Sequence, residues 1–155
     1  MNLADLRTNY TRERLRRANL HADPIAQFQL WLEQAITAGC VEPTAMSLAT
    51  ASSDGLPLLR TVLLKGCSRR GFIFFTNLES RKARHIAQNA HVSLLFPWLA
   101  LERQVIMTGT ATQLTQMEVL EYFVTRPRES QLAAWSSRQS VAITSRRCSR
   151  RLGST

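Results

Sequence analysis

The feature of this sequence that most constrains its fold is a pair of strand-like segments joined by a turn. Residues 45–52, AMSLATAS, alternate in side-chain character, and residues 57–66, PLLRTVLLKG, form a second strand-like segment. Residues 53–55, Ser-Asp-Gly, lie between them and are typical of a tight turn. Because successive side chains of a strand point to opposite faces, this pattern predicts an antiparallel hairpin.

The rest of the chain predicts further strands and a few helices. The Asp23-Pro24 pair is typical of a helix start, and the apolar residues that follow at helical spacing predict a helix ending near Gly39. Further strands are predicted over residues 72–77, 91–98 and 103–115, and further helices over residues 80–90, 116–127 and 128–140. Successive hairpins with few crossover helices favour a small antiparallel barrel over a Rossmann-type sheet. The predicted fold class is therefore mainly β with flanking helices (α+β).

The length of 155 residues suits one domain, placed at residues 21–140 between a basic arm, residues 1–20, and an Arg/Ser-rich tail, residues 141–155. The net charge is +9, but the five arginines after residue 129 are accompanied by no acidic residue, and the remainder of the chain carries +4. That balance is ordinary for a protein that handles phosphorylated small molecules. Because no nucleic-acid-binding motif accompanies the charge, binding of RNA or DNA is disfavoured.

Neither a membrane span nor secretion is expected. No apolar run reaches the roughly 18 residues that a spanning helix needs, and the N-terminus is charged without an apolar segment. We therefore expect a cytoplasmic protein. The widely spaced Cys40, Cys67 and Cys148 match no metal-ligand spacing and are expected to be free thiols.

The strongest local signal for a binding site is the sequence TNLESRKARHI. Ser80 can cap the helix that follows, which places Arg81 and Lys82 in its first turn. Cations at this end oppose the helix dipole, whereas an anion bound there would be stabilised by it. Two interpretations stay open, a phosphate-binding helix start and a solvated basic helix start.

A second group of polar residues lies in EYFVTRPRES. Tyr122 and Arg126 are four residues apart and share a helix face, and Pro127 could open a new helix that brings Ser130 to the same place. These side chains are suitable donors for a phosphate. Alternatively, Tyr122 is a half-buried aromatic residue and Arg126 pairs with the helix dipole. Gln104 lies inside a predicted strand, where its amide could pair with a heterocycle or simply face solvent.

Arg60 and Lys65 lie on one predicted strand and, by alternation, on opposite faces of it. They are therefore either unrelated surface charges or contacts for two different anions. The scattered His21, His85 and His91 are expected to be solvent-facing or structural. The sequence contains no paired carboxylates, Ser/His/Asp set or Gly-rich phosphate loop, so no catalytic residue is assigned.

Six segments, in this order and spacing, resemble the pyridoxamine 5′-phosphate oxidase (pyridoxine/pyridoxamine phosphate oxidase) family over about residues 5–140: RTVLLK, FFTNLESRKA, VSLLFPW, LERQV, EYFVTRPRESQLAAW and SSRQS. The resemblance implies an FMN-binding split β-barrel that forms a homodimer with FMN at the subunit interface. It also implies oxidation of pyridoxamine or pyridoxine 5′-phosphate to pyridoxal 5′-phosphate, with O₂ as acceptor and H₂O₂ as product.

The resemblance further implies contacts for each ligand. The implied FMN contacts are Arg60, Thr61, Val62, Leu63, Leu64, Lys65, Phe75, Thr76, Arg81, Lys82, Gln104, Gln139 and Ser140. The implied substrate contacts are Lys65, Tyr122, Arg126, Ser130, Arg7 and Tyr10. Arg60 would then face the FMN phosphate and Lys65 the substrate phosphate. Position 75 is a tyrosine in some relatives, so Phe75 implies only a ring or backbone contact, and Thr8-Asn9 departs from the usual Arg-Glu in the arm.

Family members continue beyond the end of this chain, with a Trp that packs on the flavin and an Arg-Leu-His near the substrate ring. Residues 141–155 first follow and then leave the family pattern. The resemblance therefore predicts a barrel that is incomplete at the C-terminus, with weak FMN binding and low activity. The alternatives are a catalytically inactive protein that binds FMN or pyridoxal phosphate, and a split-barrel flavin reductase with another substrate.

Overall fold

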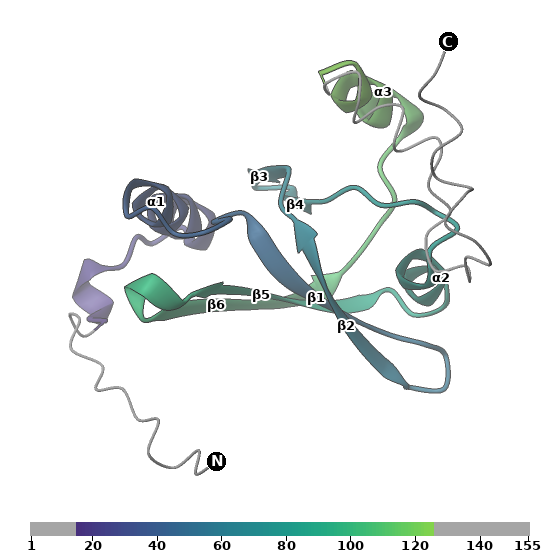
Figure 1. Ribbon diagram of the computed structural model, residues 1–155, viewed down its shortest axis with the longest axis horizontal. Helices are drawn as coiled ribbons and strands as arrows, with labels where there is room; N and C mark the ends of the chain where they lie inside the picture. The colour runs from purple at the N-terminus through teal and green to yellow at the C-terminus, as the bar shows by residue number, and fades with distance from the viewer. Residues whose placement is uncertain (1–14, 126–155) are drawn as a thin grey trace, which may run out of the picture. The chain divides into compact units, whose positions relative to one another are not determined.

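The computed structural model describes residues 15–125 of the chain (Figure 1). Its helices are η2 (Arg17–Asn19), α1 (Pro24–Thr37), α2 (Arg81–Gln88), η3 (Leu99–Leu101) and α3 (Gln116–Thr125). Its strands are β1 (Ala45–Ala51), β2 (Pro57–Leu63), β3 (Gly66–Ser68), β4 (Gly71–Ile73), β5 (His91–Trp98) and β6 (Arg103–Thr110). The described residues fall into two compact units, unit 1 with residues 15–48, 60–74 and 94–107, and unit 2 with residues 49–59, 75–93 and 108–125.

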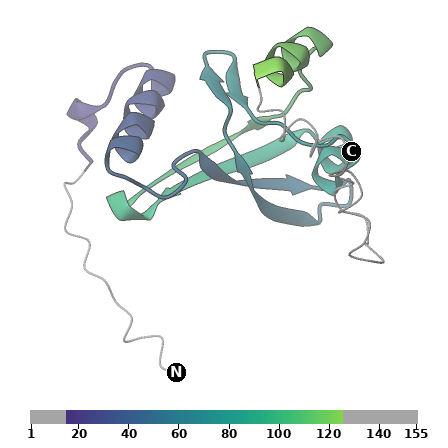
Figure 2. The same cartoon turned by 45° about the horizontal axis from the view of Figure 1, so that its top comes forward.

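A mainly antiparallel four-stranded sheet has the order β2-β1-β5-β6, and β3 and β4 form a separate antiparallel hairpin (Figures 1 and 2). Among the described residues the sheet is not closed, because β2 and β6 each have a neighbour on one side only. Burial alternates along β1, which confirms the predicted period of two. The turn after β1 is closed by Gly55, whose φ of +82° suits glycine and whose N–H donates to the Ser52 carbonyl at 3.0 Å. The predicted mainly β fold with flanking helices is confirmed.

Unit 1 contains an aromatic core under α1. The Phe28 ring lies 4.8 Å from Phe72, 4.9 Å from Phe96 and 5.8 Å from Trp98, measured between ring centroids. The predicted start of α1 is confirmed, since Oδ1 of Asp23 accepts the Ile25 N–H at 2.9 Å. All the buried hydrophobic residues of the described part belong to this unit: Phe28, Ala35, Met46, Leu48, Leu64, Leu94, Phe96 and Trp98.

Unit 2 differs because its buried described residues are polar, namely Thr50, Ser80 and His85. Ser80 is completely buried and caps α2, its hydroxyl accepting the Ala83 N–H at 3.4 Å. This confirms the predicted helix start. The Nδ1 atom of His85 lies 3.4 Å from the Thr50 hydroxyl, so His85 joins α2 to β1. Of the two roles left open for this histidine, the structure supports the structural one.

Three predicted strands are shorter than expected. The segment 72–77 contributes only its first residues to β4, β6 ends at Thr110, and β2 ends at Leu63. The physical reason at β2 is a change of partner. The Leu64 N–H still donates to the Thr44 carbonyl at 2.9 Å, beside β1, but the Lys65 N–H donates to Ile73 of β4 at 2.7 Å.

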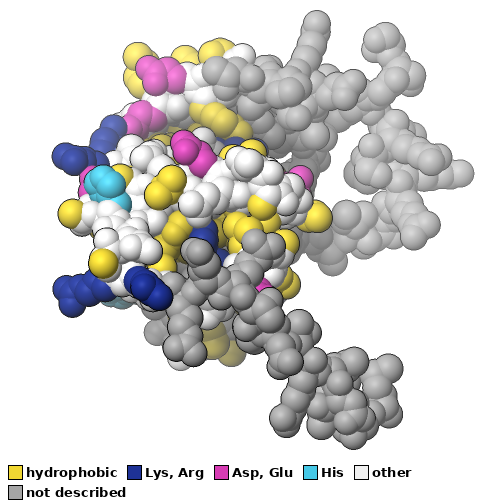
Figure 3. Space-filling model, turned by 90° about the vertical axis from the view of Figure 1, so that its left-hand side faces the viewer, with side chains coloured by type: hydrophobic (Ala, Val, Ile, Leu, Met, Phe, Trp, Pro, Cys, Tyr) yellow, Lys and Arg dark blue, Asp and Glu magenta, His cyan; other side chains and the backbone are white. Residues whose placement is uncertain are grey.

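The described part of the chain bears on the expectations about charge, cysteines and membrane spans. Figure 3 shows the Lys and Arg side chains of one face at separate positions, with hydrophobic and uncharged side chains between them. Cys40 and Cys67 are half-buried free thiols, as predicted, and burial raises the pKa of Cys67. Cys148 lies outside the described residues. Among the described helices, none has both the length and the apolar character of a membrane span.

Candidate functional site

The start of α2 gathers hydroxyl and cationic side chains in unit 2. Nζ of Lys82 donates to Oγ1 of Thr76 at 2.9 Å, and Oγ1 of Thr76 lies 3.4 Å from Oγ of Ser80. The first turn of the helix reads Arg-Lys-Ala-Arg, with Arg81 exposed and Lys82 half-buried. The positive end of the helix dipole coincides with these cations, so the arrangement suits a phosphate or another compact anion.

An aromatic stack lies in the same unit. Phe75 precedes Thr76 in the loop before α2, and its ring is stacked on that of Tyr122 in α3. The ring centroids are 3.7 Å apart and the planes differ by 7°. Both rings are half-buried. The contact joins two residues that are 47 positions apart, and nothing in the periodicity of either segment indicates it.

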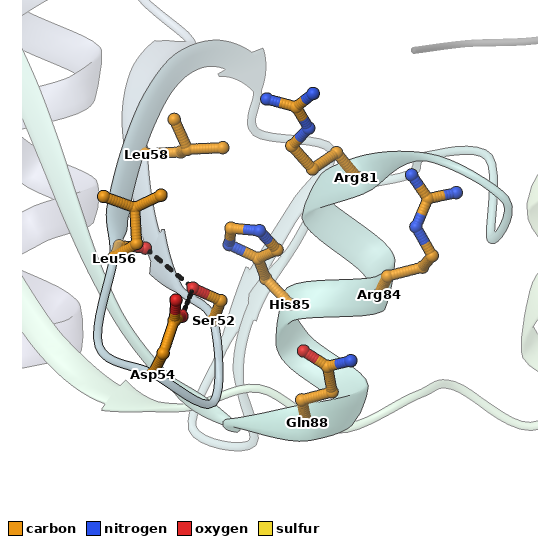
Figure 4. A pocket seen from close by; sticks show the side chains of 8 residues that line it. All are labelled: Ser52, Asp54, Leu56, Leu58, Arg81, Arg84, His85 and Gln88. Atoms are coloured by element: carbon orange, nitrogen blue, oxygen red, sulfur yellow. Dashed lines mark hydrogen bonds between the residues drawn. The ribbon is translucent and has the colours of Figure 1, made fainter. Parts of the chain in front are cut away.

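A cavity of about 340 Å³ lies between α2 and the turn after β1. Figure 4 shows the residues that line it: Ser52, Asp54, Leu56, Leu58, Arg81, Arg84, His85 and Gln88. The His85 ring points from α2 toward the turn, where the Ser52 hydroxyl donates to the Asp54 carboxylate and, in a shared hydrogen bond, to the Leu56 carbonyl at 3.3 Å. The Ser52 hydroxyl, followed by backbone N–H groups, lowers the pKa of Asp54. The sequence reasoning missed this cavity, although the four α2 residues lie at helical i, i+3, i+4 and i+7 spacing.

Unit 1 holds the predicted site residues of β2 and β6. The half-buried Arg60 donates from Nη1 to the Leu48 carbonyl at 3.0 Å, and burial lowers the pKa of its guanidinium. Lys65 lies beyond the end of β2 and is exposed, as is Gln104 on β6. Burial alternates along β2, leaving Thr61 and Leu63 exposed and Val62 half-buried, while the following Leu64 is buried.

The predicted site residues are thus distributed over both units. Unit 1 holds the segment from Arg60 to Lys65 and Gln104, whereas unit 2 holds Phe75, Thr76, Arg81, Lys82 and Tyr122. The remaining predicted contacts lie outside the described residues: Arg7, Tyr10, Arg126, Ser130, Gln139 and Ser140.

Comparison with known sequences gives the family. The sequence model of the family described as pyridoxamine 5′-phosphate oxidase matches residues 32–150. The chain is 56% identical over 146 residues to a pyridoxine/pyridoxamine 5′-phosphate oxidase of Vibrio parahaemolyticus, covering 94% of this chain and 69% of that protein. The chain belongs to the pyridoxamine 5′-phosphate oxidase family. A protein of the same name from Crocosphaera subtropica is also 56% identical over 147 residues. This match covers 95% of this chain and 69% of the Crocosphaera protein.

Two solved structures share the fold of this chain. The chain superposes on PhzG from Burkholderia lata, solved in complex with tetrahydrophenazine-1-carboxylic acid, with a TM-score of 0.80 and 30% identity. The match covers 84% of this chain and 64% of PhzG. A pyridoxamine 5′-phosphate oxidase-related, FMN-binding protein from Nostoc punctiforme has a TM-score of 0.63 at 17% identity, over 83% of this chain and 72% of its own. This second match shows the shared fold alone.

Proposed function

We propose that this member of the pyridoxamine 5′-phosphate oxidase family is an FMN-dependent oxidase of pyridoxamine or pyridoxine 5′-phosphate. The observation that carries the proposal is the 56% identity to relatives named pyridoxine/pyridoxamine 5′-phosphate oxidase, which extends over 94% of this chain. The cationic start of α2 supports it, because both FMN and the substrate are phosphate esters. The products would be pyridoxal 5′-phosphate and H₂O₂.

The residues at the start of α2 fit the phosphate of FMN. Lys82 already donates to the Thr76 hydroxyl, so its ammonium is held beside the helix end rather than extended into solvent. Arg81 follows the buried Ser80 cap, which fixes where the helix begins. Charge-assisted hydrogen bonds from such groups are the strong kind. In this proposal Arg60–Lys65, Phe75, Gln104, Gln139 and Ser140 complete the FMN contacts.

The protein would supply position and charge, while the cofactor supplies the redox chemistry. Bound FMN would provide the hydride acceptor and the place where O₂ is reduced. The substrate loses a hydride from C4′ and a proton from its oxygen or nitrogen, and O₂ takes up two electrons and two protons to give H₂O₂. Pyridoxine phosphate yields the aldehyde directly, whereas pyridoxamine phosphate yields an imine that water hydrolyses to the aldehyde and ammonia.

The chain's own contribution to substrate binding would come from groups that hold the substrate phosphate. Lys65 and Tyr122 are the described members of this group, with Arg126, Ser130, Arg7 and Tyr10 completing it. Lys65 is exposed, which leaves its ammonium accessible to a ligand. A phosphate held at a distance from C4′ orients the reacting carbon without taking part in the bond changes.

We further propose a homodimer with FMN at the subunit interface. The supporting observation is that large apolar side chains are exposed on both edge strands of the sheet. Leu59 of β2 is 68% exposed and Ile106 of β6 is 59% exposed. A mass measurement by light scattering would give about twice 17.5 kDa for the dimer, and the mass of one chain at micromolar concentration would contradict it.

The function is tested by supplying the purified full-length chain with FMN and measuring H₂O₂ formed from pyridoxamine 5′-phosphate. Pyridoxamine without its phosphate is the matched control substrate. Oxidation of the phosphorylated form, with a much lower kcat/KM for the control, is the expected result. Bound FMN without any H₂O₂ would contradict the proposal and indicate a flavin-binding protein without this activity.

Two substitutions separate the two proposed phosphate sites. Arg81→Ala should weaken FMN binding more than substrate binding, and Arg126→Ala should do the reverse. The loss of one charge-assisted contact costs about 1.5–3 kcal/mol, which is roughly one to two decades in affinity. Titrations of FMN fluorescence and the KM for substrate measure the two effects. Equal effects of each variant on both ligands would contradict the assignment.

A further inference from the structure

The proposed oxidase function assigns no role to the stack of Phe75 on Tyr122. With 3.7 Å between centroids and 7° between planes, the two rings meet face to face. Each half-buried ring therefore has one face covered by the other. A change in the side-chain torsions of either residue would break this contact, so the stack favours the observed orientation of the Tyr122 ring.

The loop before α2 connects this stack to the proposed cofactor site. Phe75 contacts Tyr122, and the next residue, Thr76, accepts the hydrogen bond from Lys82. Thr76 also lies 3.4 Å from the buried hydroxyl of Ser80. Phe75 therefore contacts Tyr122, a proposed substrate-binding residue. The next residue, Thr76, contacts Lys82, a proposed FMN-binding residue.

We propose that Phe75 is a positioning residue whose ring, by stacking on Tyr122, orients that side chain for the substrate phosphate. This inference rests on the proposed function, since it assumes that Tyr122 binds the substrate. The chemistry of the side chain supports it, because a phenylalanine ring has no hydroxyl to donate to a flavin or a phosphate. Its contribution comes from packing, and in the structure its ring packs on that of Tyr122.

A positioning role for Phe75 makes a specific kinetic prediction. If the contact between Tyr122 and the substrate phosphate is equally strong in the ground state and the transition state, weakening it raises KM and leaves kcat nearly unchanged. An aromatic pair contributes about 0.5–1.5 kcal/mol. If this energy holds Tyr122 in its binding orientation, its loss should weaken substrate binding roughly two- to tenfold. Phe75→Leu, which keeps an apolar side chain but removes the ring, should therefore raise the KM for pyridoxamine 5′-phosphate by about that factor.

The matched control and the rescue use the same chain loaded with FMN. Phe74→Leu makes the same chemical change one residue earlier, at a half-buried ring outside the stack. Phe75→Tyr restores a ring that can stack, and its KM should return to within about twofold of the wild-type value. The FMN dissociation constant should change less than the KM in Phe75→Leu. A larger effect on FMN than on KM, or an equal rise of KM in Phe74→Leu, would overturn the inference while leaving the oxidase function standing.

A second measurement does not depend on activity. Urea unfolding of Phe75→Leu, Tyr122→Leu and the double variant forms a double-mutant cycle. We expect Tyr122→Leu to change the unfolding equilibrium constant by one factor in the wild-type chain and by a factor at least twofold smaller in Phe75→Leu. Additive effects would overturn the stack as a coupling element, even if the wild-type chain oxidises its substrate. A wild-type chain that shows coupled residues but forms no H₂O₂ would contradict the oxidase proposal and, with it, the role of Phe75 in substrate binding.

Discussion

Replacing Lys82 by methionine provides the sharpest test of the proposed phosphate site at α2. The substitution removes the ammonium that donates to Oγ1 of Thr76 at 2.9 Å, while a methionine stem retains the half-buried apolar part of the side chain. A hydrogen bond to a charged group contributes about 1.5–3 kcal/mol. Because Lys82 is only half-buried and water screens part of its charge, we expect the lower half of this range. The dissociation constant for FMN should therefore rise about ten- to fortyfold.

The assay is an equilibrium titration of FMN, whose fluorescence reports the free cofactor, against the purified full-length chain at fixed ionic strength. Arg84→Met is the matched control, since it removes the same charge from the same helix turn. The Arg84 guanidinium donates to the Glu79 carbonyl at 2.7 Å and belongs to none of the proposed FMN contacts. An equal loss of affinity in both variants would refute a specific contact, because it would show that only the overall positive charge of the helix matters.

Three further predictions concern the elements that hold the site. Ser80→Ala removes the buried cap of α2, whose hydroxyl accepts the Ala83 N–H, and should lower the free energy of unfolding by about 1 kcal/mol, measured in urea; an unchanged free energy of unfolding would argue against the cap. Trp98→Phe leaves the Pro43 carbonyl without the indole N–H that reaches it at 2.9 Å, and should cost about 1–3 kcal/mol of stability; an unchanged urea midpoint would show that this bond contributes nothing. The bond from the Ile25 N–H, followed by Arg69, holds the pKa of Asp23 below its ordinary value of 3.8. The ionised Asp23 carboxylate thus stabilises the fold above pH 3.8, and this contribution is lost as the pH falls through the lowered pKa. Wild-type stability should therefore fall more steeply below pH 4 than that of Asp23→Asn, and parallel curves would contradict this.

The parts of the fold that were predictable are those in which neighbouring residues set the backbone. Asp23 and Ser80 start helices because their side-chain oxygens accept N–H groups two and three residues away. Gly55 closes the hairpin turn because its backbone adopts a positive φ. Such interactions are complete within a few residues, so their chemistry can be recognised without knowing the rest of the molecule.

The site was predictable in its chemistry but not in its contacts. A cationic helix start could be identified from Ser80, Arg81 and Lys82, because all three are adjacent in sequence. The same segment gave no indication that Ser80 would be completely buried or that Lys82 would bond Thr76. Those facts depend on how the loop before α2 folds back on the helix.

The sequence alone therefore determined the periodicity of β1, the caps of α1 and α2, and a family pattern specific enough to indicate a phosphate-binding oxidase. Only the tertiary structure decided that Arg60 would bond the Leu48 carbonyl and that Phe75 would stack on Tyr122. The physical reason is the separation in sequence of the residues that interact. Caps and turns are short-range backbone interactions that any chain with these residues can form, whereas a stack between positions 75 and 122 exists only after packing has brought distant segments together.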